Sequence, residues 1–163
     1  MFITAHIAIP YIVLRIVLFL MGVDITFSQS LLFIFFCVLP DLDVIYWVVT
    51  KRKLPDNNFR HRRWVSHLPI TYSFLFLLLI KYPTLEMLLI ILGVYSHLFL
   101  DTFASADGIM WFYPKSKRFF TYFNKGMQGI HGVRWITEGW KKTVFYKIDL
   151  LLFPLSIMLL FLF

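Results

Sequence analysis

Long hydrophobic runs alternate with short polar stretches along the whole chain. Five runs stand out, at residues 7–23, 30–49, 68–80, 85–100 and 150–163. Several are shorter than the ~20 residues of a full membrane span, so tilt and flanking aromatic residues must complete the crossing. Backbone groups in lipid have to be hydrogen-bonded within the segment, which favours helices over open strands. The pattern therefore predicts an all-α integral membrane bundle of four to five helices.

Composition narrows the class further. Hydrophobic residues make up 60% of the 163 residues and charged residues only 15%, against roughly 45–50% and about 25% in soluble domains. An ordinary water-soluble globule and a disordered chain are both excluded. We expect one membrane domain over residues 1–163. Within it we distinguish a core bundle at about 1–114, a basic aromatic surface segment at about 115–148 and a last apolar helix at about 149–163.

The charged residues are concentrated in two connections. The chain carries 16 Lys and Arg against 9 Asp and Glu, a net charge of +7. Residues 51–63 contain six basic residues and residues 102–149 contain eight, whereas residues 24–29 contain none. By the positive-inside rule, the N-terminus and both basic loops should face the cytoplasm. No basic residue precedes the first run, so we expect no removable signal peptide. Nucleic acid, the other common partner of a basic protein, is disfavoured by this interleaving.

Ionisable residues interrupt or border the apolar runs at positions that should all lie at one end of the bundle. In an up-and-down bundle the start of the first run, the end of the second, the start of the third and the end of the fourth meet at one end, which is the cytoplasmic end. The ionisable residues at these positions are His6, Asp41, Asp43, His61, His67, His97 and Asp101. Such groups are costly in a membrane and often functional. The sequence therefore predicts a polar layer at this end.

The spacing within this layer suits a metal. His97 and Asp101 are one helical turn apart, and Pro40 should bend the chain so that Asp41 and Asp43 turn inward. Neighbouring carboxylates would repel each other unless a cation lay between them. Imidazole and carboxylate ligands favour zinc, with manganese or iron as alternatives. We expect one or two ions, held by His6, Asp41, Asp43, His67, His97 and Asp101.

Each residue also has a plainer interpretation. His97 alone would more often be a buried histidine with a hydrogen-bond partner, and Asp41 could be a helix N-cap. His61 lies among arginines and could be solvated in a basic loop. His131 lies in the late loop, and we expect it to take no part.

The chain resembles the YdjM-like, LexA-regulated inner-membrane proteins, described as metal-dependent hydrolases. The matching pieces are His6, the Leu-Pro-Asp-Leu-Asp of 39–43, the His-Arg-Arg-Trp-Val-Ser-His of 61–67, the Ser-His-Leu-Phe-Leu-Asp of 96–101, and Gly-Ile-Met-Trp-Phe-Tyr-Pro at 108–114. Together they cover roughly residues 1–120. The chain departs from the family at Arg63 to Leu68, where the family usually has a small residue and Thr-His-Ser. The resemblance implies a multi-pass protein of the inner (cytoplasmic) membrane. The order of ligands is also similar to that of zinc-dependent phospholipases C and single-strand nucleases.

These observations lead to a functional hypothesis. A membrane-bound, metal-dependent hydrolase would cleave a phosphoester by means of metal-activated water. Asp43 would help hold a second ion, orient a ligand or accept the proton of the water, and His61 would be a ligand or a general acid for the leaving group. Arg62 and Arg63 would bind a phosphate. Membrane lipids are the expected partners, with an anionic phospholipid or a lipid-linked phosphate as substrate; the sequence indicates no protein partner. The alternative is a non-catalytic membrane protein, or a small ion or proton transporter, with a structural His/Asp site.

Overall fold

The structure is a computed structural model. It describes residues 3–55, 61–104, 108–122, 134, 138–142 and 144–162. Over these residues the secondary structure is helical, apart from one isolated antiparallel bridge between Ile109 and Phe120. The expected all-α bundle is confirmed.

The first two helices form an antiparallel pair. Helix α1 (Ile3–Met21) is followed by a short turn and α2 (Phe27–Val38). Thr26 caps α2: its hydroxyl accepts a hydrogen bond from the Gln29 backbone N–H at 3.2 Å, while the Gln29 side chain accepts one from the Thr26 backbone N–H at 2.9 Å. This reciprocal arrangement satisfies two of the N–H groups that a helix start leaves unbonded. The turn therefore fixes where the second crossing begins.

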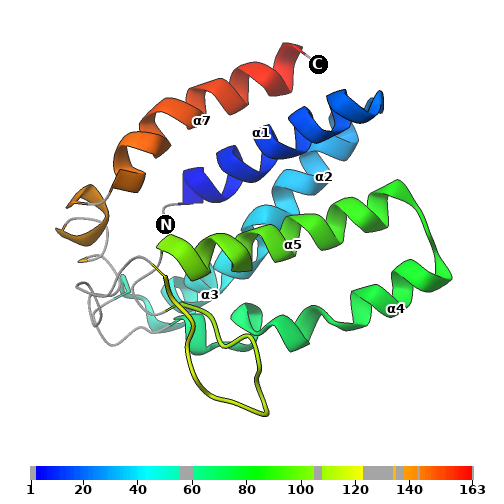
Figure 1. The fold of residues 1–163 in the computed structure, drawn as a ribbon. Coiled ribbons are helices and arrows are strands. Elements are labelled where there is room, and N and C mark those ends of the chain that lie inside the picture. The colour runs from blue at the N-terminus through cyan, green and yellow to red at the C-terminus, as the bar shows by residue number, and fades with distance from the viewer. Residues whose placement is uncertain are drawn as a thin grey trace.

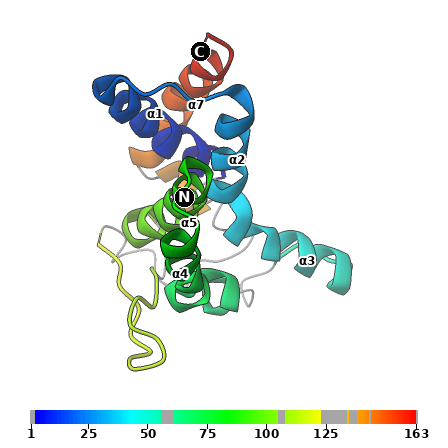
Figure 2. The ribbon, with the colours of Figure 1, turned by 90° about the vertical axis from the view of Figure 1, so that its right-hand side faces the viewer.

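The second apolar run is helical but bent. After α2, Leu39–Asp41 form a 3₁₀ turn (η1), and α3 (Leu42–Lys51) follows. Pro40 is the second residue of η1, as expected for a residue that cannot continue α-helical hydrogen bonding. Figure 2 shows α3 leaving the bundle at an angle to α2. The predicted single run 30–49 is thus two helices with the two aspartates, Asp41 and Asp43, at the joint.

Short 3₁₀ turns then carry the chain back into the bundle: η2 (His61–Arg63), η3 (Val65–His67) and η4 (Pro69–Tyr72). They lead into α4 (Phe74–Lys81), which lies beside α5 (Leu85–Ala104). Near the C-terminus, η6 (Trp140–Lys142) precedes α7 (Val144–Leu162), which packs along α1. Figure 1 shows α1 and α7 side by side and α5 between them and α4.

Helix α7 begins earlier than its hydrophobic run suggested. The sequence places the start near 149, but the helix starts at Val144. Asp149 lies inside this helix, is buried, and accepts hydrogen bonds from Trp140 Nε1 at 2.8 Å and Thr4 Oγ1 at 3.4 Å. The polar residue is accommodated by α1 and η6, which periodicity alone does not reveal.

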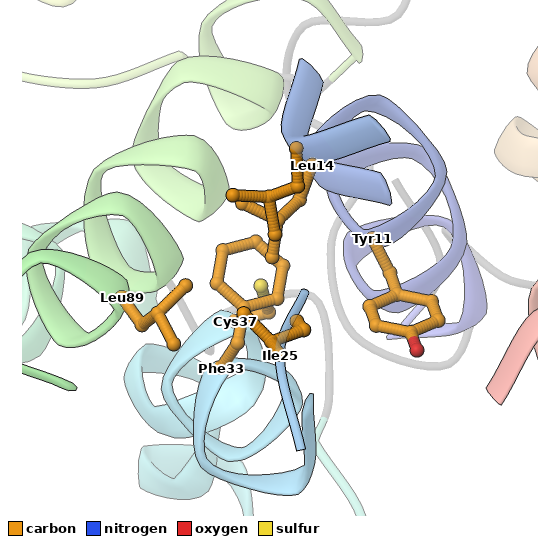
Figure 3. Packing of buried hydrophobic residues seen from close by; sticks show 7 residues of the cluster. Tyr11, Leu14, Ile25, Phe33, Cys37 and Leu89 are labelled. Atoms are coloured by element: carbon orange, nitrogen blue, oxygen red, sulfur yellow. The ribbon is translucent and has the colours of Figure 1, made fainter. Parts of the chain in front are cut away.

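The bundle buries a modest core and exposes much apolar surface. The core between α1, α2 and α5 contains Tyr11, Leu14, Phe33, Cys37 and Leu89 (Figure 3). Outward-facing residues such as Phe19 and Leu20, by contrast, are 82% and 76% exposed. Such surface is typical of lipid contact rather than of a soluble monomer. Three helical stretches are long and apolar enough to cross a membrane, at Ile3–Met21, Phe27–Lys51 and Leu85–Phe103, and a shorter apolar one occupies Pro69–Lys81.

Gly93 allows α5 to lie closely against α2. A Cβ atom at this position would lie 2.9 Å from both the Phe33 carbonyl oxygen and the Phe36 Cβ. We expect Gly93→Ala to lower the stability by about 1–3 kcal/mol, because the helices must separate or shift. Thermal unfolding in detergent measures this effect. Leu92→Ala, at a 42% exposed position on the same helix, is the control. An unchanged midpoint for Gly93→Ala would contradict this contact.

Candidate metal centre

Six ionisable residues from five elements meet at one end of the bundle. His6 comes from the second turn of α1, and His97 and Asp101 come from the last turns of α5. Asp41 ends η1, Asp43 lies in the first turn of α3, and His67 ends η3. Five of the six are buried: His67 and His97 are fully inaccessible, His6 and Asp101 are 1% exposed, and Asp43 is 7% exposed. Asp41 is partly exposed, with 15% of its side chain accessible. The polar layer predicted at this end is thus a compact buried cluster.

Because the chain bends at Pro40, Asp41 and Asp43 take different positions relative to the histidines. Asp41 Oδ1 faces two imidazoles, at 3.5 Å from His67 Nε2 and 3.7 Å from His97 Nε2. Asp43 lies one step further out, where its Oδ2 is 3.4 Å from His67 Nδ1. A continuous α-helix would separate these residues by about 200° around its axis. The 3₁₀ turn lets both carboxylates approach His67.

Hydrogen bonding fixes the orientation of His97. Its Nδ1 lies 2.7 Å from the backbone carbonyl oxygen of Cys37. A carbonyl oxygen can only accept a hydrogen bond, so Nδ1 carries the proton and the neutral ring has its lone pair on Nε2. That Nε2 is buried and has no hydrogen-bond partner among the described residues. A buried acceptor without a donor is costly, and a metal ion would satisfy it.

His67 is oriented by a serine and a carboxylate. Ser66 Oγ donates to Asp43 Oδ2 at 2.9 Å and lies 3.2 Å from His67 Nδ1. Because the Ser66 hydroxyl donates its proton to Asp43, its oxygen can accept a hydrogen bond from His67 Nδ1–H. The His67 ring is then oriented with Nε2 toward Asp41 and Asp101. Burial lowers the pKa of His67, but hydrogen bonds and charge from Asp41 and Asp43 outweigh it and raise the pKa to about 9. The negative charge that attracts this proton also favours a metal cation, which competes for the same nitrogen.

His6 completes the cluster from α1. Its Nε2 is 3.4 Å from Asp101 Oδ1, and its ring stacks on His97 with centroids 4.0 Å apart. Its Nδ1 is buried and has no hydrogen-bond partner in the described part of the chain. His6, Asp41 and His97 form one group whose ligand atoms lie within 4.8 Å of one another, and His67, His97 and Asp101 form another. His97 belongs to both groups.

The distances within the cluster fit a small divalent ion. His67 Nε2 and His97 Nε2 each face Asp41 Oδ1 and Asp101 Oδ2, at 3.5, 3.7, 3.7 and 3.9 Å. A tetrahedral zinc ion with ligands at about 2.0–2.1 Å holds them about 3.3–3.4 Å apart. The four His–Asp separations exceed this spacing by a few tenths of an ångström, and Asp41 and Asp101 belong to different ligand groups that share His97. We call these four side chains, Asp41, His67, His97 and Asp101, the four-residue cage.

The three candidate residues at 61–63 are placed differently from one another. Arg62 is 7% exposed and holds Asp101 with two hydrogen bonds, Nε to Oδ2 at 2.9 Å and Nη2 to Oδ1 at 3.2 Å. Arg63 is exposed, and its guanidinium lies over the Phe119 ring at 5.6 Å. The backbone of His61 lies in η2, while its side chain and the whole of His131 fall outside the described residues.

Two supporting groups were not assigned from the sequence. The Cys37 carbonyl that holds His97 is a backbone atom, for which the pattern of side chains gives no signal. Ser66 received no role, and the signal available for it was its position immediately before the candidate ligand His67. Both groups act by orienting a histidine rather than by contacting a metal.

Ser66→Ala offers a direct test of this support. We expect the affinity for zinc to fall about 10–100-fold, the range typical of outer-shell substitutions. The reason is that His67 Nδ1 loses its acceptor while Asp43 loses a donor. Competition with a chelator of known affinity measures the change. Ser66→Thr, which keeps the hydroxyl, should restore binding, and equal affinities for all three proteins would contradict the role.

Comparison with known proteins identifies the family. A model described as YdjM inner membrane protein matches residues 1–163, the whole chain. No curated protein and no solved structure matches.

Proposed function

The chain belongs to the YdjM inner membrane protein family, and we propose that it is a metal-dependent hydrolase that cleaves a phosphoester at the membrane surface. The observation that carries the proposal is that the Nε2 atoms of two oriented imidazoles, His67 and His97, each face two carboxylate oxygens at 3.5–3.9 Å. A divalent ion bound there would polarise a phosphoryl oxygen and lower the pKa of a water molecule. Zinc suits these ligands, and manganese or iron could replace it.

The residues around the cage take distinct roles in this proposal. Asp41, His67, His97 and Asp101 hold the ion, and His6 adds a further ligand or serves a second ion. Asp43 positions His67 through Ser66, which its contacts support more than direct ligation. His61 is the proposed proton donor to the leaving group.

Arg62 and Arg63 take different roles in the proposed phosphate binding. Arg62 is committed to Asp101, so its guanidinium acts beside the cage. Arg63 is exposed next to it and is the better placed to meet a phosphate from outside. Guanidinium groups pair with phosphate oxygens through two parallel hydrogen bonds, which gives orientation as well as charge.

An aromatic and basic surface beside the cage supports a lipid substrate. Trp64 contacts the rings of Tyr46 and Trp47 on α3, and Lys51 and Lys53 lie 5.9 and 5.8 Å from the Trp47 ring. Tryptophan and tyrosine favour the membrane–water interface, and basic residues attract anionic headgroups. We propose an anionic phospholipid or a lipid-linked phosphate as substrate; the same surface makes nucleic acid the weaker choice.

Orientation in the membrane follows from the same residues. We propose that the N-terminus, the cage and both basic loops face the cytoplasm, because residues 51–63 carry six basic residues. A reporter active only in the cytoplasm, inserted after Lys53, should be active. A reporter inserted after Asp24, in the loop without basic residues, should be silent. The reverse pattern would overturn this orientation.

A structural metal is the second candidate. Four protein ligands close a tetrahedral site, which is the coordination of structural zinc, whereas a catalytic ion needs an open position or a fifth ligand. The two candidates differ in turnover. A non-catalytic site would bind zinc and stabilise the fold without hydrolysing any phosphoester.

An assay of hydrolysis in proteoliposomes distinguishes a catalytic ion from a structural one. The metal-loaded protein is reconstituted with phosphatidylglycerol, phosphatidic acid, a polyprenyl diphosphate or phosphatidylcholine, and released phosphate or headgroup is measured. We expect turnover of at least one anionic substrate, lost in Asp101→Asn. Gln29→Ala, at the opposite end of the bundle where Gln29 Nε2 donates to Glu86 Oε1, should keep it. Metal binding without turnover across the panel would favour the structural site.

A further inference from the structure

Helix α3 leaves the bundle sideways. In Figure 1 the helices α1, α5 and α7 run roughly across the page, and in Figure 2, turned by 90°, α3 runs lengthwise away from them. The apolar stretch Phe27–Lys51, at 25 residues, has the length and composition of one membrane span, but the 3₁₀ turn at Leu39–Asp41 bends it. When α1 and α5 cross the bilayer, α3 therefore runs close to the plane of the membrane.

The surface of α3 has two chemically different sides. Ile45 and Val49 are one turn apart and are 59% and 68% exposed, so they form an aliphatic stripe. Asp43 and Trp47 are each two residues from Ile45, which places both about 160° away from it around the helix axis. Asp43 faces His67 on that opposite side. An aliphatic stripe opposite a polar and aromatic side is typical of a helix that lies in a membrane interface.

The polar side carries the residues that phospholipid headgroups attract. The ammonium groups of Lys51 and Lys53 lie 5.9 and 5.8 Å from the centre of the Trp47 ring, and Trp64 contacts both Trp47 and Tyr46. Tryptophan and tyrosine are enriched at the level of the headgroups, and lysines near a membrane attract anionic lipids. Lysine is depleted in protein–protein interfaces, so this charge favours a lipid surface over a protein partner.

The length of the crossing before the bend supports the same arrangement. Helix α2 has 12 residues and η1 has three, which together span about 24 Å. The hydrocarbon core of a bilayer is about 30 Å thick. A short crossing is accommodated by local thinning of the bilayer and by lysines that extend toward the headgroups. The edge of the hydrocarbon then lies close to the level of α3.

We propose that α3 is an amphipathic helix that lies in the plane of the membrane, at the cage end of the bundle. Ile45 and Val49 enter the upper part of the acyl chains, while Lys51 and Lys53 contact anionic headgroups. This contact does not depend on a metal. One consequence does rest on the proposed function: because Asp43 of the same helix faces His67, the cage lies at the level of the headgroups, where the phosphoester of a lipid substrate lies.

The depth of two labels on α3 tests this placement. Nitroxide labels are attached to Ile45→Cys or Val49→Cys in a Cys37→Ala background, and the whole chain is reconstituted in phosphatidylglycerol and phosphatidylethanolamine. Depth is measured by electron paramagnetic resonance from the accessibility to oxygen and to a water-soluble nickel complex. The two depths should agree within about 2 Å, because residues four apart on an in-plane helix lie at one level. The exposed pair Val13→Cys and Val17→Cys on α1 is the matched control, and its depths should differ by about 6 Å.

Each other outcome overturns the proposal in a recognisable way. Depths at 45 and 49 that differ by about 6 Å would show that α3 continues the crossing. Labels reached by nickel but not by oxygen would place α3 in water, and labels reached by neither would show a protein partner or a second copy on this face. All three results leave the metal site of the proposed function standing. If Cys37→Ala does not fold, the labels are placed in the native chain, where Cys37 is buried, and the signal of the labelled wild type is subtracted.

A second measurement tests the preference for anionic lipid. A fluorescent label on Val49→Cys should be quenched at least twofold more by phosphatidylglycerol than by phosphatidylcholine, each carrying a nitroxide near the ester end of an acyl chain. Lys51→Gln/Lys53→Gln should remove this difference. Lys115→Gln/Lys117→Gln, which loses the same charge at exposed positions elsewhere, should keep it. Equal quenching by the two lipids in the parent protein would overturn the headgroup contact.

Discussion

Replacing His97 by alanine is expected to release the metal ion. His97 is the residue common to both groups of potential ligands, and its Nε2 faces Asp41 and Asp101 from a position fixed by the Cys37 carbonyl. Loss of a direct ligand should weaken binding by more than the 10–100-fold typical of an outer-shell change, thus by at least ~100-fold. The purified wild type should contain metal in a stoichiometric amount, and His97→Ala should retain less than about one tenth of it. Elemental analysis of the two proteins, purified side by side, measures this.

Two controls make the result specific. His131→Ala removes a histidine that we expect to take no part and should keep the full metal content. His97→Ala must also remain folded, as judged by a single symmetric peak in size-exclusion chromatography. A folded His97→Ala protein with wild-type metal content would show that the ion, if any, lies elsewhere. Absence of metal from both proteins would favour a hydrogen-bonded packing network without a metal.

The helical fold could be predicted because it follows from local physics. Apolar runs in lipid must form helices, so the approximate positions of α1, α5 and the α2–α3 run were evident from hydrophobicity. The breaking effect of Pro40 was evident too, since proline cannot continue an α-helix. The start of α7 was not, because Asp149 is accommodated only by contacts with Trp140 and Thr4, far away in the sequence or across a turn.

The composition of the polar layer was predictable for a topological reason. Alternating helices return the chain to the same end at every second connection, so residues such as His6, His67 and His97 had to share one level. Knowing that residues lie at the same end of the bundle does not, however, give the distances between their side chains. That Asp41 Oδ1 faces both His67 and His97 while Asp43 lies behind Ser66 depends on the 3₁₀ geometry of η1.

The pairing of Arg62 with Asp101 could not be inferred from spacing. The two residues are 39 positions apart, and nothing in the run of arginines at 60–63 distinguishes the buried one from the exposed one. The sequence therefore assigned Arg62 and Arg63 the same phosphate-binding role. Burial separates them: Arg62 faces the carboxylate, whereas Arg63 faces outward over Phe119.

Removing the metal should strongly lower the thermal stability of the protein. An ion that binds only the folded state stabilises it by about 4 kcal/mol when present at 1,000 times its dissociation constant. For a chain of this size, that corresponds to a fall in the unfolding midpoint of roughly 8–16 °C on chelation. The physical reason is the layer itself: the carboxylates of Asp41, Asp43 and Asp101 lie around His67 at low exposure, and a bound cation offsets their mutual repulsion. Differential scanning fluorimetry in detergent, with and without EDTA and then with zinc restored, measures the shift.

The decisive comparison is with a protein whose cage is already incomplete. Asp41→Asn removes a carboxylate that faces both His67 and His97, so its midpoint should respond to EDTA by less than about 2 °C. Gln29→Ala, at the far end of the bundle, should respond like the wild type. An equal response in Asp41→Asn and the wild type would place the stabilising ion outside the cage. Because the shift depends on binding and not on turnover, this result holds for a catalytic and a structural ion alike. Together with the hydrolysis measurement, it therefore separates whether an ion binds in the cage from what that ion does.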